Sequence, residues 1–315
     1  MINSYTLRDG RLMTQPVTRK KQLTADCLWI DLEKPADEEL HWIGEVYGQQ
    51  LPTMDTLVEI EASSRFFQDE SGLHVRSYFL HEIPGQVSNV TVAFVLNKGR
   101  LFTLRDETLE SFHQYGRSLE MQKGLVIDAF GIMLGLFETK VNRLADLLEQ
   151  LHVDLEALSA RVFHAEEQDF DEVLTILAAS QDKNDKARLS LMDKQRTLSY
   201  LLRSKGNSEE VLSLLHEILR DIRSLDEHST FLFEKVQFLM DVTMGRINIE
   251  QNKIIKVFSI AAVVFLPPTL IASIYGMNFH LMPEFSWSFG YPLALLLMIA
   301  AGIAPYCYFK RKKWF

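Results

Sequence analysis

The stretch that decides the fold is VFSIAAVVFLPPTLIASIY, residues Val257 to Tyr275, which contains no charged side chain. A second charge-free run, FSWSFGYPLALLLMIAAGIAPYCYF, extends from Phe285 to Phe309. Each run meets the requirement of about 20 mainly apolar residues for a helix that spans the bilayer core. The N-terminus lacks the charged and then apolar pattern of a secretion signal. The sequence therefore predicts an integral membrane protein with two retained C-terminal spans.

The basic residues around these runs predict their orientation. The second run is followed by Lys310 to Lys313, and the first is preceded by Arg246, Lys253 and Lys256. The connector 276–286 contains no Lys or Arg. By the positive-inside rule, both termini are expected in the cytoplasm and the connector outside.

The composition narrows the class of function. There are 33 Lys and Arg residues against 42 Asp and Glu, which gives a net charge of −9. An acidic surface disfavours nucleic acid as a partner and favours cations. The sequence contains no HExxH, GxSxG or CxxC arrangement and no phosphate-binding glycine loop, so we predict neither an enzyme nor a prosthetic group.

The first 110 residues alternate strand and helix signals. Asp9-Gly10 and Asn97-Lys98-Gly99 are turn sequences typical of hairpins. Periodicity and strand propensity predict strands within 5–12, 27–32, 66–67, 73–80, 90–96 and 100–104, with helices at 36–47 and 55–62. We therefore expect a compact α/β domain.

Long helices follow this domain. An apolar stripe with helical spacing runs from Phe130 to Val162, and a second helix is expected from Val173 to Arg203. The third helix begins near Ser208 with apolar residues spaced alternately by four and three, which is the pattern of a coiled-coil seam. No strong helix breaker precedes the first span, so this helix is expected to continue to Tyr275.

A second stripe on the third helix is polar or small at most positions. It begins at Asp241 and arrives at Gly276 in steps of four and three residues. Its positions are Gly245, Asn248, Asn252, Ile255, Ser259, Ala262, Leu266, Thr269 and Ser273. Polar side chains at membrane depth are costly unless they face protein or water, so the stripe is expected to face an interior.

Two interpretations of this stripe remain open. Small residues also mediate helix packing in membranes, and that role selects the same residue types. If the stripe instead lines a water-filled path, several copies must surround it under cyclic symmetry, because two spans cannot enclose a path. In that case Leu266, with Ile255 or Phe258, would form apolar constrictions. Asp241 would form a carboxylate ring at the cytoplasmic entrance and is the candidate metal and gating residue.

The residues after the first span carry a resemblance to a known family. Tyr275-Gly276-Met277-Asn278 follows Phe265-Leu266-Pro267-Pro268-Thr269, with Met282-Pro283-Glu284 in the connector and Trp287-Ser288-Phe289-Gly290-Tyr291-Pro292 at the second run. Upstream matches include 247–252 and 29–32, so the likeness covers the whole chain. This pattern resembles the CorA family of magnesium and cobalt transporters.

The resemblance implies the fold class and the assembly. The fold expected is an α+β cytoplasmic domain (an αβα sandwich), followed by long helices that form a funnel, plus two C-terminal transmembrane helices. The expected segments are 1–110 (α/β domain), 111–206 (antiparallel helices), 207–252 (stalk), 253–275 (first span), 276–286 (external loop), 287–309 (second span) and 310–315 (basic tail). The resemblance also implies a homopentamer in lipid, located in a bacterial inner membrane.

The resemblance further implies the ions and their site. Mg²⁺ would be both the transported and the regulatory ion, with Co²⁺ as a second permeant ion and Ni²⁺ as a further candidate. Gly276, Met277 and Asn278 would form the external selectivity filter, supported by Tyr275 and Glu284. A ring of Asn278 amides would hold the hydration shell of Mg²⁺, an ion that dehydrates reluctantly. Mg²⁺ bound between acidic cytoplasmic domains would close the pore.

Three alternatives accompany this prediction. One is a CorA-related zinc transporter, and another is a two-span membrane receptor with a signalling coiled coil. The third concerns only the motif, which could be an ordinary turn in which Gly276 caps the helix and Asn278 takes a left-handed conformation. The intact Met277 argues against the zinc transporter, and the polar stripe argues against the receptor.

Overall fold

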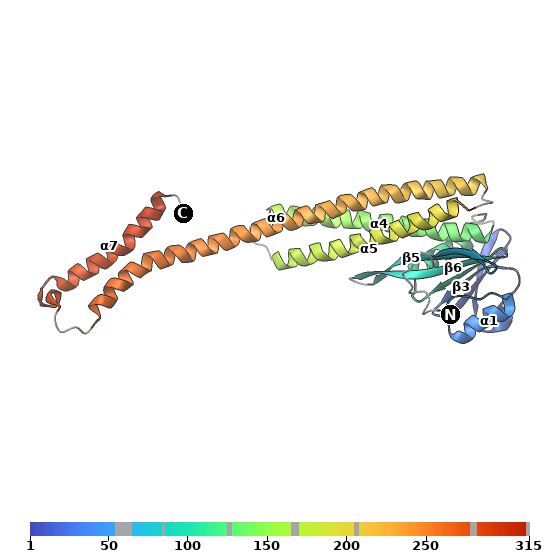
Figure 1. Ribbon diagram of the computed structural model, residues 1–315, viewed down its shortest axis with the longest axis horizontal. Coiled ribbons are helices and arrows are strands. Elements are labelled where there is room, and N and C mark those ends of the chain that lie inside the picture. The colour runs from blue at the N-terminus through green and yellow to red at the C-terminus, as the bar shows by residue number, and fades with distance from the viewer. Residues whose placement is uncertain are drawn as a thin grey trace. The chain divides into compact units, whose positions relative to one another are not determined.

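The computed structural model describes residues 1–53, 65–83, 86–124, 128–164, 170–204, 208–277 and 282–312, with the side chains of His164, Glu284 and Phe285 outside this description. The chain divides into two compact units, Met1–Met240 and Asp241–Phe315. Helix α6, Glu209–Tyr275, is unbroken and belongs to both (Figure 1). The predicted fold class of an α+β domain, long helices and two apolar C-terminal helices is confirmed.

The first unit begins with a seven-stranded sheet. Its strands are β1 (Ile2–Arg8), β2 (Arg11–Val17), β3 (Cys27–Glu33), β4 (Phe66–Asp69), β5 (Gly72–Ile83), β6 (Gln86–Asn97) and β7 (Arg100–Arg105). They lie in the order β2-β1-β3-β7-β6-β5-β4. Only the β3–β7 pair is parallel, and the other neighbours are antiparallel. A short 3-10 helix, η1 (Lys20–Gln22), connects β2 to β3.

Both predicted hairpin turns are present. Asp9 and Gly10 have φ values of 50° and 76°, and Lys98 and Gly99 have φ values of 48° and 73°. Two successive residues with positive φ form the turn whose twist matches that of the flanking strands. The register confirms this, because Arg8 pairs with Arg11 and Asn97 pairs with Arg100.

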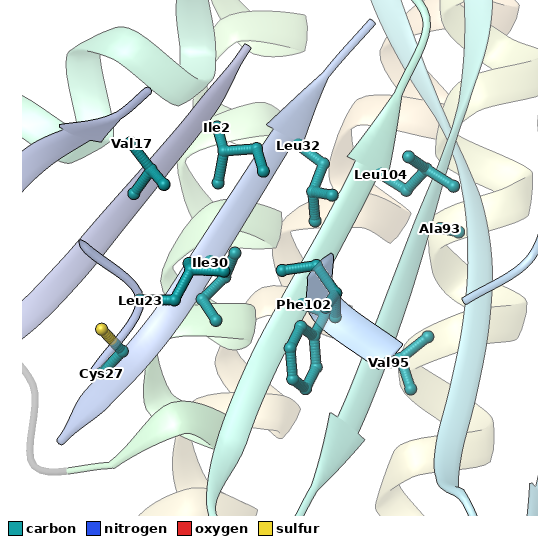
Figure 2. Close-up of a cluster of buried hydrophobic side chains, with 11 residues drawn as sticks. Ile2, Val17, Leu23, Cys27, Ile30, Leu32, Ala93, Val95, Phe102 and Leu104 are labelled. Carbon is teal, nitrogen blue, oxygen red and sulfur yellow. The ribbon is translucent and has the colours of Figure 1, made fainter. Parts of the chain in front are cut away.

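One face of the sheet is covered by helix α1 (Asp37–Tyr47) (Figure 1). Figure 2 shows Ile30, Leu32, Phe102 and Leu104 side by side on the adjacent strands β3 and β7. These residues alternate along each strand, as expected when successive side chains point to opposite faces. Ile43 of α1 is fully buried against this cluster.

The other face packs on helices. Its aromatic residues include Phe79 and Phe94, whose rings lie 5.5 and 6.5 Å from that of Phe112 in α3 (Glu110–Met121). The same face carries a buried ion pair, in which Arg105 Nη2 lies 2.8 Å from Asp31 Oδ2. The predicted three-layer α/β/α arrangement is therefore observed.

The long helices follow their predicted stripes. Helix α4 extends over Ala129–His164 and α5 over Phe170–Leu202. Nearly all of the predicted α4 stripe is buried, and so is most of the α6 seam: Leu215, Ile218, Ile222, Ser229, Leu232, Val236, Leu239 and Thr243. The helix predicted at 55–62 lies outside the described residues.

Strand β5 is longer than its neighbour β4. Side chains of the long helices form hydrogen bonds to the part of the β5 edge that β4 does not cover. The β4 pairing ends where Phe66 meets Val75. Farther along, the Tyr78 amide donates to Asp193 Oδ2 at 2.8 Å, and Lys194 donates to the Tyr78 carbonyl. Lys140 Nζ donates to the Leu80 carbonyl at 2.7 Å. Open strand edges invite unwanted pairing, so these contacts both protect the edge and fix α4 and α5 to the sheet.

The second unit contains the end of α6, a short 3-10 helix η3 (Pro283–Ser286) and helix α7 (Gly290–Arg311). Both α6 and α7 include a window that is long and apolar enough to cross a membrane. Pro267 and Pro268 lie inside α6 without ending it, and Pro305 lies inside α7.

Candidate functional site

The predicted motif begins where α6 ends. The Gly276 amide donates to the Ala272 carbonyl at 2.9 Å, which continues the helical hydrogen bonding by one residue. The Met277 amide then contacts the Ile274 carbonyl at 3.3 Å, in the tighter pattern common at helix ends. Gly276 has no positive φ. The turn alternative gives the left-handed conformation to Asn278, which lies outside the described residues, so that alternative stays a prediction.

The side chains of two predicted site residues lie outside the described part of the structure. Asn278 lies outside the described residues. Glu284 lies within η3, but its side chain is not described. The selectivity filter of Gly276, Met277 and Asn278 therefore stays a prediction.

The polar stripe is exposed along its whole length within the single chain. This holds for Asp241, Gly245, Asn248, Asn252, Ile255, Ser259, Ala262, Leu266, Thr269, Ser273 and Gly276. The two large apolar members, Ile255 and Leu266, are 61% and 65% exposed. The stripe thus carries amide, hydroxyl and small side chains at regular intervals on an exposed part of α6, and residues 248–259 of this helix are exposed on every side.

The opposite face of α6 packs against α7. Its partly buried residues are Ile260, Ala261, Val264, Pro267, Pro268, Ile271 and Tyr275. At 3.6 residues per turn, this face and the polar stripe lie about 180° apart. A Cβ added to Gly302 of α7 would lie 3.3 Å from Pro268 Cγ and 3.6 Å from the Val264 carbonyl oxygen, so α7 meets α6 closely at the proline pair.

The proline pair also changes the hydrogen bonding inside α6. A proline at 268 has no amide hydrogen, so it cannot bond to the carbonyl of Val264, four residues earlier. The helix survives because neighbouring groups can support such freed carbonyls. Farther along, the Thr269 hydroxyl donates to the Phe265 carbonyl at 2.7 Å. The sequence analysis did not identify Gly302, although a glycine within an apolar span is a known signal of close helix packing.

Ligand chemistry along the stripe is that of neutral oxygen donors. Asn248 and Asn252 are exposed one helical turn apart, and Ser259, Thr269 and Ser273 add hydroxyls. Across the described part of the chain, no group of three or more His, Cys, Asp or Glu side chains is placed to hold a metal ion. Asp241 is exposed at the start of the stripe.

A serine, a histidine and an aspartate meet at the β4–β5 turn, which the sequence analysis did not single out. The Ser71 hydroxyl oxygen lies 2.8 Å from His74 Nε2, and Asp69 Oδ1 lies 3.2 Å from the same nitrogen. A catalytic base instead uses one nitrogen for the nucleophile and the other for its carboxylate. Ser71 also donates directly to Asp69 at 2.6 Å, so the cluster stabilises the turn.

Comparison with known proteins gives a consistent result. Residues 24–311 match the family model described as CorA-like Mg2+ transporter protein. The chain is 48% identical over 316 residues to the Magnesium transport protein CorA of Salmonella typhimurium and equally to that of Escherichia coli strain K12. The matches cover 100% of this chain and 100% of each relative.

Solved structures agree on the fold. The complete structure of the CorA magnesium transporter from Methanocaldococcus jannaschii matches with a TM-score of 0.78 at 19% identity, over 100% of this chain and 99% of that one. The cytoplasmic domain of ZntB from Vibrio parahaemolyticus matches with a TM-score of 0.59 at 14% identity, over 78% of this chain and 97% of that one. At such identities the likeness concerns the fold alone. The sequence matches carry the assignment, and by them this chain belongs to the CorA family, which is a family of transporters and not of enzymes.

Proposed function

We propose that this protein transports Mg²⁺ across a membrane along the polar stripe of α6. The observation that carries the proposal is that the stripe is exposed from Asp241 to Ser273 and, over residues 259–273, lies opposite the face that packs on α7. A second support is the 48% identity to relatives named as magnesium transport proteins. Neutral amide and hydroxyl oxygens suit an ion that keeps its water, because Mg²⁺ dehydrates reluctantly.

The transporting unit is a ring of identical chains. Two spans of one chain cannot enclose a water-filled path, so the exposed stripe has to meet other copies of itself around an axis. Following the resemblance to the family, we propose that the ring has five copies. In this arrangement α6 lines the path and α7 forms an outer layer that contacts lipid.

Selection takes place at the outer end of the stripe. Gly276, Met277 and Asn278 form the filter, with Tyr275 and Glu284 supporting it. The Asn278 amide oxygens of the ring hold the first hydration shell of the ion. Neutral amides attract a cation less strongly than carboxylates would, so the ion can leave as well as enter.

The pathway closes when cytoplasmic Mg²⁺ is abundant. The ion bridges acidic surfaces of neighbouring subunits, and its loss lets like charges separate them. Asp241 is the candidate gating residue because it is an exposed carboxylate at the inner end of the stripe. Leu266 and Ile255 are the apolar constrictions of the closed state.

The chain lies in a bacterial inner membrane with both termini in the cytoplasm. The absence of Lys and Arg from the connector 276–286 supports this orientation. The segments 1–110, 111–206, 207–252, 253–275, 276–286, 287–309 and 310–315 are its functional divisions, from the α/β domain to the basic tail.

Co²⁺ is a second transported ion, and Ni²⁺ is a further candidate. A related zinc transporter is the second candidate function, since the cytoplasmic fold is shared with the ZntB domain. The much higher identity to the magnesium transport proteins favours Mg²⁺. Membership of a transporter family argues against the two-span receptor.

Flux into liposomes tests these proposals. The full chain is reconstituted, and uptake of Mg²⁺, Co²⁺, Ni²⁺ and Zn²⁺ is compared with and without a proton gradient and with and without internal Mg²⁺. We expect Mg²⁺ uptake that needs no proton gradient and that falls when internal Mg²⁺ is present. Uptake of Zn²⁺ alone would establish the alternative.

Variants at Asn278 test the filter. Asn278→Ala should abolish uptake, while Asn278→Asp should retain ion binding and slow release, because a carboxylate holds the ion more tightly. The mass of the detergent-solubilised assembly, measured by light scattering, shows whether each variant is still a pentamer. Unchanged uptake by an intact Asn278→Ala assembly would remove the proposed role.

A further inference from the structure

A cavity of about 400 Å³ lies inside the second unit, between the end of α6 and the start of α7. Gly276, the first residue of the proposed filter, is part of its wall. The remaining wall residues are Ala272, Tyr275, Trp287, Ser288, Gly290, Tyr291, Ala294, Leu295 and Met298.

The wall is chemically suited to an apolar guest. None of its residues is charged, and most of them are apolar or aromatic. Ala294 is 7% exposed and gives the cavity a small-residue wall on α7, and Met298 has a flexible side chain that adapts to irregular guests. A hydrated cation or a phosphate group finds no charged partner among these residues.

The cavity is large enough for such a guest to enter. Engineered apolar cavities of about 150 Å³ stay dry and take up small apolar molecules from solution. Binding sites for small molecules begin at about 300 Å³ and are lined mainly by apolar and aromatic residues. This cavity of about 400 Å³ falls within the second size range and has the same kind of lining, so it can take a small apolar occupant.

The aromatic residues indicate where the cavity lies in the bilayer. Trp287 and Tyr291 are 58% and 76% exposed, and both are wall residues. Exposed Trp and Tyr side chains in membrane proteins gather at the level where headgroups meet acyl chains. The apolar molecule present there at high concentration is the acyl chain of a phospholipid.

We infer that this cavity binds one acyl chain of a membrane phospholipid, which lies against the C-terminal end of α6 beside Gly276. The bound chain supports the last turn of the helix from which the filter begins. The inference needs the two spans to cross a membrane, but it does not depend on which ion is transported. It therefore goes beyond the proposed function and can fail separately from it.

Photochemical labelling in vesicles tests the inference. The full chain is reconstituted in phosphatidylcholine that carries a diazirine on one acyl chain, and the labelled peptides are mapped by mass spectrometry. Ala272 and Met298, which line the cavity, should be labelled, and Leu296, an exposed residue of α7, reports labelling by bulk lipid. Absence of label at Ala272 and Met298 would overturn the inference.

Two variants make the test specific. Ala294→Phe fills the cavity and should reduce labelling of Ala272 and Met298 several-fold, while labelling of Leu296 stays unchanged. Ala300→Phe adds the same side chain at an exposed position of α7 outside the cavity and should change nothing. If Ala294→Phe does not assemble, Ala272→Leu fills the cavity from α6, with labelling read at Met298.

The remaining outcomes are also decisive. A neighbouring copy that occupies the cavity would leave Ala272 and Met298 unlabelled in the unmodified chain, which overturns the inference. Undiminished labelling in an assembled Ala294→Phe protein would do the same. Mg²⁺ uptake measured on the same vesicles reports separately on transport, so a chain that labels as expected without transporting refutes only the proposed function.

Discussion

Replacing Asp193 with asparagine should destabilise the first unit more than any exposed Asp to Asn change. Asp193 lies on α5, and its side chain is 4% exposed. One carboxylate oxygen accepts from Arg65 at 2.5 Å, and the other accepts from the Ser77 hydroxyl at 2.6 Å and from the Tyr78 amide at 2.8 Å. All three donors belong to the sheet or to the residue that precedes it, so one carboxylate fixes α5 to the edge of β5.

The loss in the free energy of unfolding follows from the hydrogen bonds that an asparagine side chain at this position can still accept. Its single oxygen can serve Ser77 and Tyr78, but its amide group then points at Arg65, so two donors face each other. The Arg65 side chain is only 15% exposed and would lose its counter-charge. Breaking a buried ion pair from one side costs about 3–5 kcal/mol. For a unit of this size that corresponds to a decrease in melting temperature of about 10 °C.

The assay is thermal unfolding of the full detergent-solubilised chain, followed by tryptophan fluorescence, to which Trp29 and Trp42 of the first unit contribute. The matched control is Asp182→Asn on the same helix. Asp182 pairs with Lys186 at 2.7 Å, but the two side chains are 55% and 35% exposed. Exposed pairs contribute about 0–1 kcal/mol, so the control should melt within a few degrees of the unmodified chain.

A second variant tests the cause of the loss. If the cost comes from the unpaired charge, Arg65→Met in the Asp193→Asn background should recover part of the melting temperature. Equal melting temperatures for Asp193→Asn and Asp182→Asn would refute the reasoning. So would a double variant that melts no higher than Asp193→Asn alone.

Three further predictions concern other parts of the chain. Burial, together with the nearby Lys194 ammonium, lowers the pKa of Lys140 to about 7. Between pH 7 and 10 the unfolded chain therefore binds more protons than the folded chain, so the free energy of unfolding rises with pH. Lys140→Met should reduce this rise, as measured by thermal melts that are followed by circular dichroism at several pH values. Gly72→Ala should lower the melting temperature far more than Gly48→Ala. Both glycines have positive φ, but a Cβ at Gly72 would lie 2.4 Å from a backbone oxygen of β6. A Cβ at Gly48 would meet nothing within 4 Å. Leu266→Ser should raise resting Mg²⁺ uptake by wetting the proposed constriction, whereas Phe265→Ser, beside it but off the stripe, should not; equal fluxes would contradict that role.

The sequence predicted the elements whose signals are local. Asp9-Gly10 and Lys98-Gly99 specify their turns through two adjacent residues, and the α4 stripe repeats every turn. It could not predict how the edge of β5 is covered, because Asp193 and Tyr78 are 115 residues apart. Lys194 is fully buried beside the carbonyl of Tyr78, and no local sequence signal distinguishes it from an exposed lysine of the same helix.

The stripe on α6 shows the same limit at the candidate site. Its composition left two roles open, because small and polar residues suit both a water-filled path and close helix packing. The contact between α6 and α7 uses the opposite face, where Pro268 and Val264 meet Gly302. Packing within the chain therefore does not account for the stripe. In a single chain Asn248, Asn252, Ser259, Thr269 and Ser273 would meet lipid or bulk water, and for this reason we propose that they face an interior made by several chains.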